Sequence, residues 1–359
     1  MLGKTKQSIN IAKVAFSYMG AVVGAGFTSG QELMQFFVAL KAQKTAALLL
    51  VTVLFMVFGW ATLYLNRKYR CKNYSSFLQC LLGNRIARLF DLLLGFFLFS
   101  GVGIMLSATG ALFAEHLALP FSLGVSLLAL TIIVVLAKEV QGILWINTIL
   151  MPFKFFIIIL VSVLIVANVS PTHSFLGDYA SGFEPVVYPW WLAGIVYVSY
   201  NLLLGLAVLV SLGETGWGPG LGRAGLWGGL GLGIFAGAIV LALNGYWPVV
   251  TQYQVPMVYL AAQVHPGIKI LYISVLGMGM VTTGVACAHT LTTRLAHSLR
   301  FPYFPILCLT TVVAIPLAQM GFGRLVRLIY PLFGYAGLIL LIGLTWRTIE
   351  ALGEYRIQR

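Results

Sequence analysis

The sequence predicts an all-α membrane protein with about ten transmembrane helices, and three observations carry that prediction. Of the 359 residues, 60% are hydrophobic and only 9% are charged, whereas soluble domains carry about 25% charged residues. Apolar stretches of membrane-spanning length recur along the whole chain, and at roughly 30 to 35 residues for each span and its loop the length allows about ten. Only short loops separate them, so one transmembrane domain is predicted over residues 1–359.

The apolar segments are spaced evenly along the chain. They are predicted at about 9–40, 46–65, 86–114, 117–136, 143–167, 189–212, 224–243, 268–298, 302–319 and 325–346. A short helix is predicted at 255–264, in the loop before the eighth segment. The first segment is too long for a signal peptide and has no small-residue cleavage site, so we expect it to be retained.

The basic residues predict the orientation in the membrane. Of the 22 Lys and Arg residues, Lys154 lies inside a segment, and five lie at one set of segment ends: Lys41, Lys44, Lys269, Arg324 and Arg327. The other sixteen lie at the opposite ends. Because positive residues favour the cytoplasmic side, both termini are expected in the cytoplasm and the loop around Asp178 outside the cell (plasma or inner) membrane. The net charge of +13 is thereby explained without nucleic-acid binding.

The first segment contains a glycine-rich run that disfavours a continuous helix. Four glycines fall within eleven residues: Gly20, Gly24, Gly26 and Gly30. Each costs roughly 1 kcal/mol against alanine in a helix interior. Polar side chains follow at Thr28, Ser29, Gln31 and Glu32. A helix interrupted between about Val23 and Gln31 is predicted; the alternative, that the glycines only allow close helix packing, leaves the polar residues unexplained.

An interrupted helix offers a binding site made of backbone groups. The second half presents free amides and the positive end of its dipole, while the first half ends in free carbonyls that suit a cation. We therefore expect a ligand carboxylate at the amides of Ala25 and Gly26, and we include Gly24, Ser29 and Gly30 among the predicted ligand-binding residues.

The sixth segment resembles the first in its pattern. Four polar groups lie at mid-depth, namely Tyr197, Ser199, Tyr200 and Asn201, and Gly205 follows. A second interruption is predicted near Gly205, at the same depth as the one near Gly24, with carbonyls free to meet a ligand's amine. Paired interruptions are typical of inverted repeats, and five segments in each half make the halves antiparallel. The predicted repeats are 8–167 and 188–347, with Tyr197, Tyr200 and Asn201 lining the site.

The run Gly24-Ala25-Gly26-Phe27-Thr28-Ser29-Gly30-Gln31-Glu32, followed by Gln35-Phe36-Phe37, resembles the opening helix of the YkvI family of bacterial membrane proteins. That family is grouped with the amino acid–polyamine–organocation superfamily, whose proteins have the LeuT-type fold. The resemblance implies a five-plus-five inverted repeat in which segments one and six are broken around a central substrate site.

The resemblance also implies roles for individual residues. Amides at Ala25 and Gly26 correspond to those that hold a substrate carboxylate. Carbonyls of Gly20 and Val23, with the hydroxyls of Thr282 and Thr283, correspond to a second sodium site. Ala21 stands where an asparagine contributes to the first sodium site, so that site is not expected here.

Lys154 is an ionisable residue deep in the fifth segment. It lies roughly 18 Å from Gly142 and roughly 21 Å from Asn168 along a helix, too far for its side chain to reach either membrane surface. A charged lysine at mid-membrane costs at least about 3 kcal/mol. One alternative is a structural lysine that holds carbonyls of a broken helix. The other is a titrating group in the place of the second sodium ion, as in some proton-coupled members of the superfamily.

Three further residue types are open to more than one interpretation. Glu32 is either an acid placed at a helix start by the dipole or a group involved in gating or proton transfer. His289 is expected to be a hydrogen-bonded packing residue rather than part of a site. The four cysteines show no metal-binding spacing and are given no role: Cys71, Cys80, Cys287 and Cys308.

These patterns together predict a secondary active transporter of a small amino acid or related zwitterion. A membrane receptor or sensor for such a ligand is the alternative, and no enzyme motif is found. Coupling to protons is expected at Lys154; a sodium ion at Gly20, Val23, Thr282 and Thr283 is the alternative. The expected partners are a small-molecule substrate and the lipid bilayer, with no cofactor and no nucleic acid.

Overall fold

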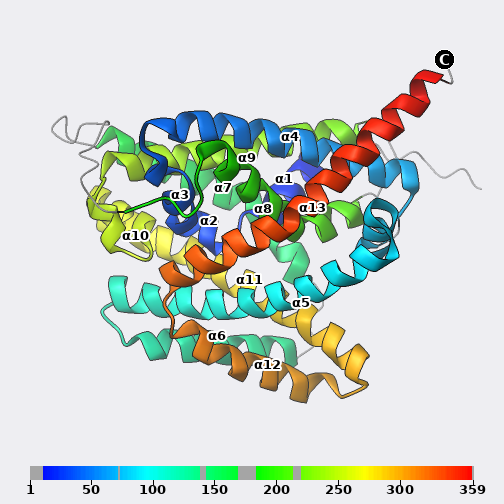
Figure 1. The fold of residues 1–359 in the computed structure, drawn as a ribbon. Helices are drawn as coiled ribbons and strands as arrows, with labels where there is room; N and C mark the ends of the chain where they lie inside the picture. Colours follow the sequence, from blue (N-terminus) through cyan, green and yellow to red (C-terminus); the bar gives the residue numbers. More distant parts are fainter. Residues whose placement is uncertain (1–10, 72, 138–142, 169–182, 213–219, 358–359) are drawn as a thin grey trace, which may run out of the picture.

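The computed structural model describes residues 11–71, 73–137, 143–168, 183–212 and 220–357 (Figure 1). All regular structure in these ranges is helical. The predicted outer loop around Asp178 lies outside the described residues.

The first half of the chain begins with the interrupted segment. It consists of α1 (Ile11–Val22), α2 (Ala25–Ser29), α3 (Gln31–Phe36) and a 3₁₀ turn, η1 (Val38–Gln43). Four long helices follow: α4 (Lys44–Tyr69), α5 (Tyr74–His116), α6 (Phe121–Ala137) and α7 (Ile143–Ala167). Helix α5 begins twelve residues before the predicted segment at 86–114. Its backbone bends at Gly83, whose φ is +76°.

The second half has five main helices. They are α8 (Trp190–Leu212), α9 (Leu221–Gly245), α11 (Pro266–Leu299), α12 (Tyr303–Ala318) and α13 (Phe322–Ile357). The turn η3 (Val249–Gln252) and the short helix α10 (Pro256–Val264) precede α11. The short helix predicted at 255–264 is therefore confirmed, and each predicted apolar segment corresponds to helix in the structure.

Seven helices in the described part of the chain are long and apolar enough to cross a membrane. Three more apolar helices are shorter: α1, α6 and α12. In α1 the cause is the interruption itself, because the same segment continues through α2 and α3. The protein is thus a multi-pass, all-α membrane protein, as the composition predicts.

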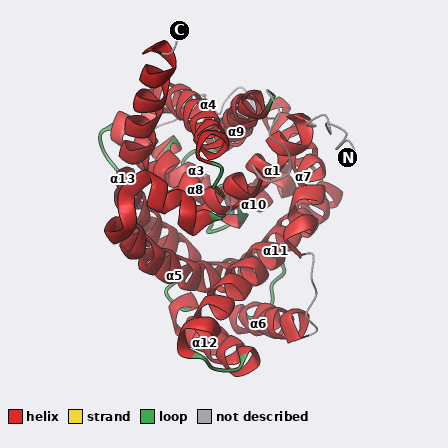
Figure 2. Ribbon diagram, turned by 90° about the vertical axis from the view of Figure 1, so that its right-hand side faces the viewer, coloured by secondary structure: helices red, strands yellow, loops and turns green. Residues whose placement is uncertain are grey.

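The helices form a ring around a small central group (Figure 2). The view runs along the helices and places α3, α8 and α10 inside a ring that includes α4, α9, α13, α5 and α11, while α6 and α12 lie together outside it. Helices at equivalent positions of the two halves pack against each other, α4 on α9 and α5 on α11. This pairing is consistent with the predicted repeats at 8–167 and 188–347, which stay a prediction.

The contact between α4 and α9 is made largely by backbone. A Cβ atom added to Gly225 would lie 2.6 Å from the carbonyl carbon of Gly59 and 2.6 Å from the amide nitrogen of Trp60. One turn further, Gly229 faces the backbone of Met56 just as closely. Small residues at such an interface allow membrane helices to approach each other closely. We call this contact the glycine seam (Gly59, Gly225, Gly229).

The predicted interruption of the first segment is confirmed. Gly24 has extended backbone (φ −89°, ψ −175°) and precedes α2. Gly30 is left-handed (φ 82°, ψ −10°) and separates α2 from α3, a conformation that glycine adopts at little cost. The glycines therefore act by ending helices, and the alternative of close packing alone does not describe this segment.

The predicted interruption near Gly205 is not found, because α8 runs without a break from Trp190 to Leu212. Its polar residues are satisfied without one. Asn201 Nδ2 donates to the Tyr197 carbonyl one turn earlier (2.9 Å), and Ser199 Oγ donates to the Gly334 carbonyl of α13 (2.7 Å). Since neither bond requires a freed carbonyl within α8, the mid-depth polar groups do not mark a break here.

Candidate functional site

The break between α1 and α2 has one open and one filled side. A Cβ added to Gly24 would meet no atom within 4 Å, so the backbone there faces open space. At Gly26 the same atom would lie 2.6 Å from Glu32 Oε2 and 2.8 Å from the Tyr330 hydroxyl. The first amides of α2 have no partner within the helix by their position. The break thus combines unpaired donors with a neighbouring carboxyl group.

Glu32 lies at the centre of the molecule, where α3 contacts α8. Its side chain is almost entirely buried (3% exposed), and its Oε1 accepts a hydrogen bond from the Tyr197 hydroxyl (2.8 Å). None of the ion pairs in the described structure involves it. A buried carboxylate without a cation costs several kcal/mol, so this group needs either a proton or a positively charged partner.

Three buried tyrosines surround this carboxyl group, and we call them the tyrosine cluster (Tyr197, Tyr200, Tyr330). The ring centroids of Tyr197 and Tyr200 are 5.3 Å apart, and those of Tyr200 and Tyr330 are 4.8 Å apart. Tyr330 comes from α13, and no sequence pattern singled it out, because aromatic residues are abundant throughout the chain. The structure therefore brings together Gly26, Glu32 and the tyrosine cluster from four helices.

The other predicted ligand-binding residues are less directly placed. Ser29 Oγ donates to the Gly26 carbonyl (2.8 Å) and accepts from the Gln31 amide (3.2 Å), so its hydroxyl serves the local turn. Gly30 packs under Met257 of α10. The Asn201 side chain donates its hydrogen bond within its own helix, to the Tyr197 carbonyl. Contact of these residues with a ligand stays a prediction.

Lys154 is buried in α7, two residues after Pro152, with 3% of its surface exposed. It lies about 16 Å along the helix from Ile143 and about 20 Å from Ala167. Its Nζ is 3.9 Å from the point where a Cβ on Gly279 of α11 would stand. Lys154 therefore lies close to α11, and its role in coupling stays a prediction.

Two of the predicted cation-site residues follow Gly279 on α11. Thr282, one turn after Gly279, donates to the carbonyls of Met278 (2.9 Å) and Gly279 (3.2 Å); Thr283 is half-buried beside it. Gly20 lies in the last turn of α1, near the break, and Lys154, Gly20 and Thr282 each have further interaction partners.

Tyr272 is a site residue that the sequence did not indicate. Its hydroxyl donates to the Thr28 carbonyl (2.7 Å) and so ties α11 to the end of α2. Thr28 Oγ1 in turn donates to the Gly24 and Ala25 carbonyls (3.2 and 3.3 Å). The Tyr272 bond satisfies a carbonyl at the end of α2, which is the condition for irregular backbone inside a membrane. Thr28 Oγ1 adds a second donor to the Gly24 carbonyl, which already accepts from the Thr28 amide (3.1 Å).

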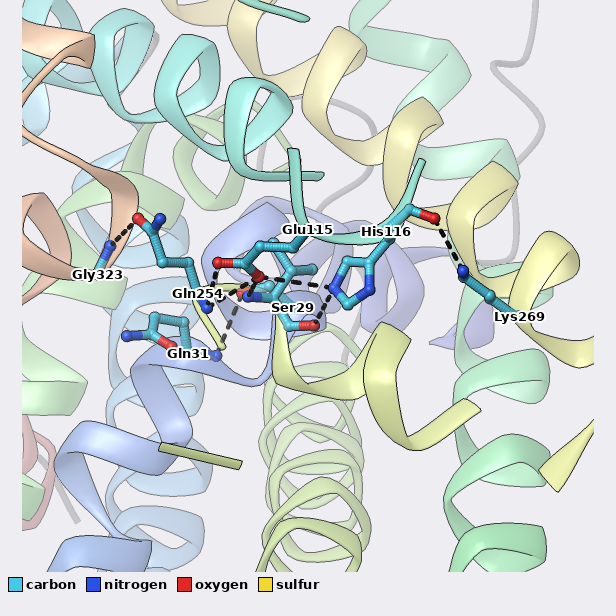
Figure 3. A network of polar contacts seen from close by, with 8 residues as sticks. Ser29, Gln31, Glu115, His116, Gln254, Lys269 and Gly323 are labelled. Atoms are coloured by element: carbon cyan, nitrogen blue, oxygen red, sulfur yellow. Dashed lines mark hydrogen bonds and ion pairs between the residues drawn. The ribbon is translucent and has the colours of Figure 1, made fainter. Parts of the chain in front are cut away.

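A polar network closes the side of the site covered by α10 (Figure 3). The Glu115 carboxylate, at the end of α5, accepts from the amides of Gln254 (2.9 Å) and Val255 (3.1 Å). His116 Nε2 lies 3.0 Å from the Val255 carbonyl, and Lys269 Nζ donates to the His116 carbonyl (2.8 Å). The start of α10 is therefore fixed to the ends of α5 and α11.

The same network continues to α13 and α3. Gln254 Oε1 accepts from the Gly323 amide (3.3 Å), and Gln35 Nε2 donates to the Gly323 carbonyl (2.9 Å). We call these residues the α10 latch (Gln35, Glu115, His116, Gln254, Lys269, Gly323). Most of its bonds use backbone groups, which is why no side-chain motif in the sequence revealed it.

Two other residue types lie away from the centre. His289 is exposed and its Nδ1 is 2.9 Å from the Tyr303 hydroxyl, so it is a hydrogen-bonded residue outside the site. The thiols of Cys71 and Cys80 are 3.6 Å apart. Burial, followed by the neighbouring Cys80 thiol, raises the pKa of the Cys71 thiol to about 12, which keeps it protonated at neutral pH.

The interrupted first helix, the helix pairing and the central polar site define a membrane protein of the LeuT-type fold. Solved structures of this fold cover almost the whole chain. MhsT in complex with L-phenylalanine matches with a TM-score of 0.61 at 16% identity, covering 95% of this chain and 88% of that one. A Na⁺-coupled sialic acid symporter matches at 0.60 and 15%, covering 93% and 76%.

A manganese transporter of Eremococcus coleocola matches at 0.58 and 14% identity, covering 93% of this chain and 78% of that one. These three are membrane transporters and none is an enzyme. At such identities the likeness establishes the fold.

Two curated proteins of Bacillus subtilis (strain 168) are similar in sequence. YyaD is 28% identical over 329 residues, covering 90% of this chain and 93% of YyaD. The membrane protein YkvI is 28% identical over 328 residues, covering 91% of this chain and 93% of YkvI. No family model matches the chain. The resemblance to YkvI predicted from the first helix is thus confirmed over nearly the whole length.

Proposed function

We propose that the protein is a secondary active transporter of a small amino acid or related zwitterion that works by alternating access. One observation carries this proposal: an interrupted helix places free amides and a buried acid at the centre of a LeuT-type fold, with open space at Gly24. The relatives of this fold include MhsT, solved with L-phenylalanine, which supports an amino acid as ligand. A ligand carboxylate at the amides of Ala25 and Gly26 fits this arrangement.

Proton coupling at Lys154 is the second part of the proposal. A buried ammonium beside Gly279 ties α7 to α11 as a bound cation would, and loss of its proton removes that tie. Sodium coupling is the alternative, favoured by the sialic acid symporter, which is Na⁺-coupled. Two cations in one small site repel each other, so protonated Lys154 and a sodium ion at Thr282 exclude one another.

Flux measurements separate a transporter from a receptor. The purified protein is first screened for thermal stabilisation by the common amino acids, at varied pH and sodium. Those that stabilise it are then tested for uptake into proteoliposomes. We expect uptake that a pH gradient drives and a sodium gradient does not. Stabilisation without any flux would support the receptor, and uptake that needs sodium and ignores pH would refute proton coupling.

The role of Lys154 is tested by Lys154→Ala, with Lys44→Ala at the start of α4 as the control. We expect Lys154→Ala to lose pH-driven uptake while ligand binding and exchange persist, because the binding residues lie elsewhere. Lys44→Ala should behave as the wild type. Equal loss of driven uptake and of exchange would mean that Lys154 is structural.

The orientation, with both termini in the cytoplasm, is tested by single cysteines at two exposed positions. Ala42 lies in a predicted outer loop and Gly353 near the end of α13. On intact cells, a membrane-impermeant thiol reagent should label Ala42→Cys and leave Gly353→Cys unlabelled until the membrane is opened. The reverse pattern would overturn the orientation predicted from the basic residues.

A further inference from the structure

The continuous helix α8 leaves one end of a zwitterionic ligand without its predicted partner. The amine was expected to meet carbonyls set free by an interruption near Gly205. In the structure those carbonyls belong to an unbroken helix, and the Tyr197 carbonyl already accepts a bond from Asn201 Nδ2 (2.9 Å). A positively charged amino group bound near the break therefore needs another acceptor.

Glu32 is placed to be that acceptor. Its Oε2 lies beside Gly26 at the break, and its Oε1 is held by the Tyr197 hydroxyl. The carboxyl group therefore stands between the amides of α2 and the tyrosine cluster, directly next to the site proposed for a ligand. Its second oxygen thus lies on the side of the break, next to the Gly26 backbone.

Among the residues that the structure describes, no fixed positive charge is found next to Glu32 to neutralise it. The elements that pack on α3 are α2, α8, α9, α13 and η1. The titratable groups that they turn towards Glu32 are the three phenols of the tyrosine cluster. The lysine of η1, Lys41, is exposed to solvent. One positive charge, from a proton or from a ligand, is thus missing at this point of the described structure.

We propose that the Glu32 carboxylate binds the ammonium group of the ligand, and that the tyrosine cluster forms the wall around it. This inference rests on the proposed function and names the feature of the substrate that the site selects: a positively charged amino group. Tyrosine faces attract cations, and a carboxylate supplies the full counter-charge. The ligand's own carboxylate is then needed less than its amine.

The exchange of charge at Glu32 can be written as a balanced step. Without ligand, the carboxyl group carries a proton, because a bare carboxylate would be buried unpaired. When the ammonium ion binds, the O–H bond of the carboxyl group breaks, the proton leaves to water and an ion pair forms. Binding of one ammonium group therefore releases one proton. The ion pair that forms is neutral overall, as the protonated carboxyl group was, and the ligand's own carboxylate adds one negative charge at the amides of α2.

Three chemical forms of the same amino acid test this proposal on the wild-type protein. Alanine, leucine and phenylalanine are each used as the free amino acid, as the C-terminal amide, which keeps the ammonium, and as the N-acetyl derivative, which lacks it. Affinity is measured by calorimetry, and released protons are counted by repeating it in two buffers with different heats of ionisation.

The amine should dominate in this series. We expect the N-acetyl forms to bind about 10- to 100-fold more weakly than the free amino acids, as loss of a charge-assisted bond costs about 1.5–3 kcal/mol. The amides should retain most of the affinity, and both binding forms should release about one proton. N-acetyl forms that bind as well as free amino acids would overturn the proposal.

Glu32→Gln supplies the second arm, with the exposed Glu184→Gln as the matched control. We expect Glu32→Gln to lose the preference for amines and the proton release, and Glu184→Gln to keep both. If none of the nine compounds binds the wild type, the amino-acid function fails together with this inference. If amino acids are transported but the amine preference or the proton release is absent, the inference fails alone.

Discussion

The first helix of each half reaches the centre of the molecule, but only one of the two is interrupted. The segment α1–α3 contains four glycines within eleven residues, and its backbone leaves the helix at Gly24 and again at Gly30. Helix α8 has two glycines, eleven residues apart, and stays helical from Trp190 to Leu212. The first contributes backbone and one carboxyl group to the site; the second contributes tyrosine side chains.

The comparison shows that a break needs partners as well as glycines. The Thr28 carbonyl, at the end of α2, is satisfied by the Tyr272 hydroxyl of a distant helix, and Thr28 Oγ1 adds a second bond to the Gly24 carbonyl. In α8, Asn201 donates a hydrogen bond to the Tyr197 carbonyl, and Ser199 donates one to a carbonyl of α13. Polar residues at mid-depth therefore mark a possible site, and the density of glycines decides whether the backbone opens.

The largest difference between the two regions is expected in the effect of glycine substitutions on ligand binding. Gly26→Val should abolish ligand binding, because the first side-chain atom would already stand at 2.6 Å from Glu32 Oε2 and at 2.8 Å from the Tyr330 hydroxyl. The same overpacking should lower the free energy of unfolding by about 1–3 kcal/mol. Thermal stabilisation by the ligand of the wild type is the measurement.

The matched change in the continuous helix is Gly205→Ala. Its Cβ would make an ordinary contact, 3.4 Å from Val22 Cγ2, and alanine should stabilise a helix interior by roughly 0.5–1 kcal/mol over glycine. We expect a raised melting temperature with binding retained. If Gly26→Val kept its affinity for the ligand, or Gly205→Ala lost it, the ligand site would have to be assigned to α8 and not to the break in the first helix.

A smaller effect is expected from the bond that joins the two regions. Tyr197→Phe leaves Glu32 Oε1 without its donor, which should cost about 1–3 kcal/mol for a buried acceptor. Tyr188→Phe, at an exposed tyrosine just before the same helix, is the control. Denaturation midpoints of the two variants should differ, and equal midpoints would contradict the importance of the Glu32–Tyr197 bond.

The tethers of the two regions to their neighbours can be compared next. Tyr272→Phe removes the donor to the Thr28 carbonyl and should increase amide hydrogen exchange in α2 and α3. Ser199→Ala removes the donor to the Gly334 carbonyl and should leave exchange in α8 nearly unchanged, since that helix keeps its own bonds. Each bond is worth about 1 kcal/mol. Similar exchange changes in both variants would show that the break is as rigid as the helix.

The smallest effect is expected from Asn201→Ala. The substitution removes a bond within α8, while alanine favours the helix by up to about 0.7 kcal/mol, so the two effects nearly cancel in the melting temperature. Ligand affinity is the informative measurement. A large loss of affinity would show that Asn201 contacts the ligand despite its bond to the Tyr197 carbonyl.

The sequence was sufficient to predict the helices and the first interruption. Apolar length sets the positions of the segments, and a glycine such as Gly24 or Gly30 reports a local backbone preference, which does not depend on distant residues. The short helix α10 was predictable for the same reason, from its local apolar pattern and Pro256 at its start.

The candidate site, the continuity of α8 and the α10 latch depend on contacts between residues far apart in sequence. Glu32 and Tyr197 are 165 positions apart, and nothing in either neighbourhood indicates the other. The continuity of α8 depends on where Ser199 and Asn201 find acceptors. The α10 latch is built mainly on backbone groups such as those of Gly323 and Val255, which every sequence has. Neither the pairing nor the latch could therefore be predicted.

The glycine seam limits how the two halves can move. Where Gly225 and Gly229 lie against the backbone of α4, a slide by one residue, about 1.5 Å along the axis, would bring a side chain to a place where only hydrogen fits. Translation along the seam is therefore sterically blocked, whereas tilting about it separates or closes the helix ends without such a clash. We therefore expect any relative motion of α4 and α9 to be a tilt about the seam and not a slide along it.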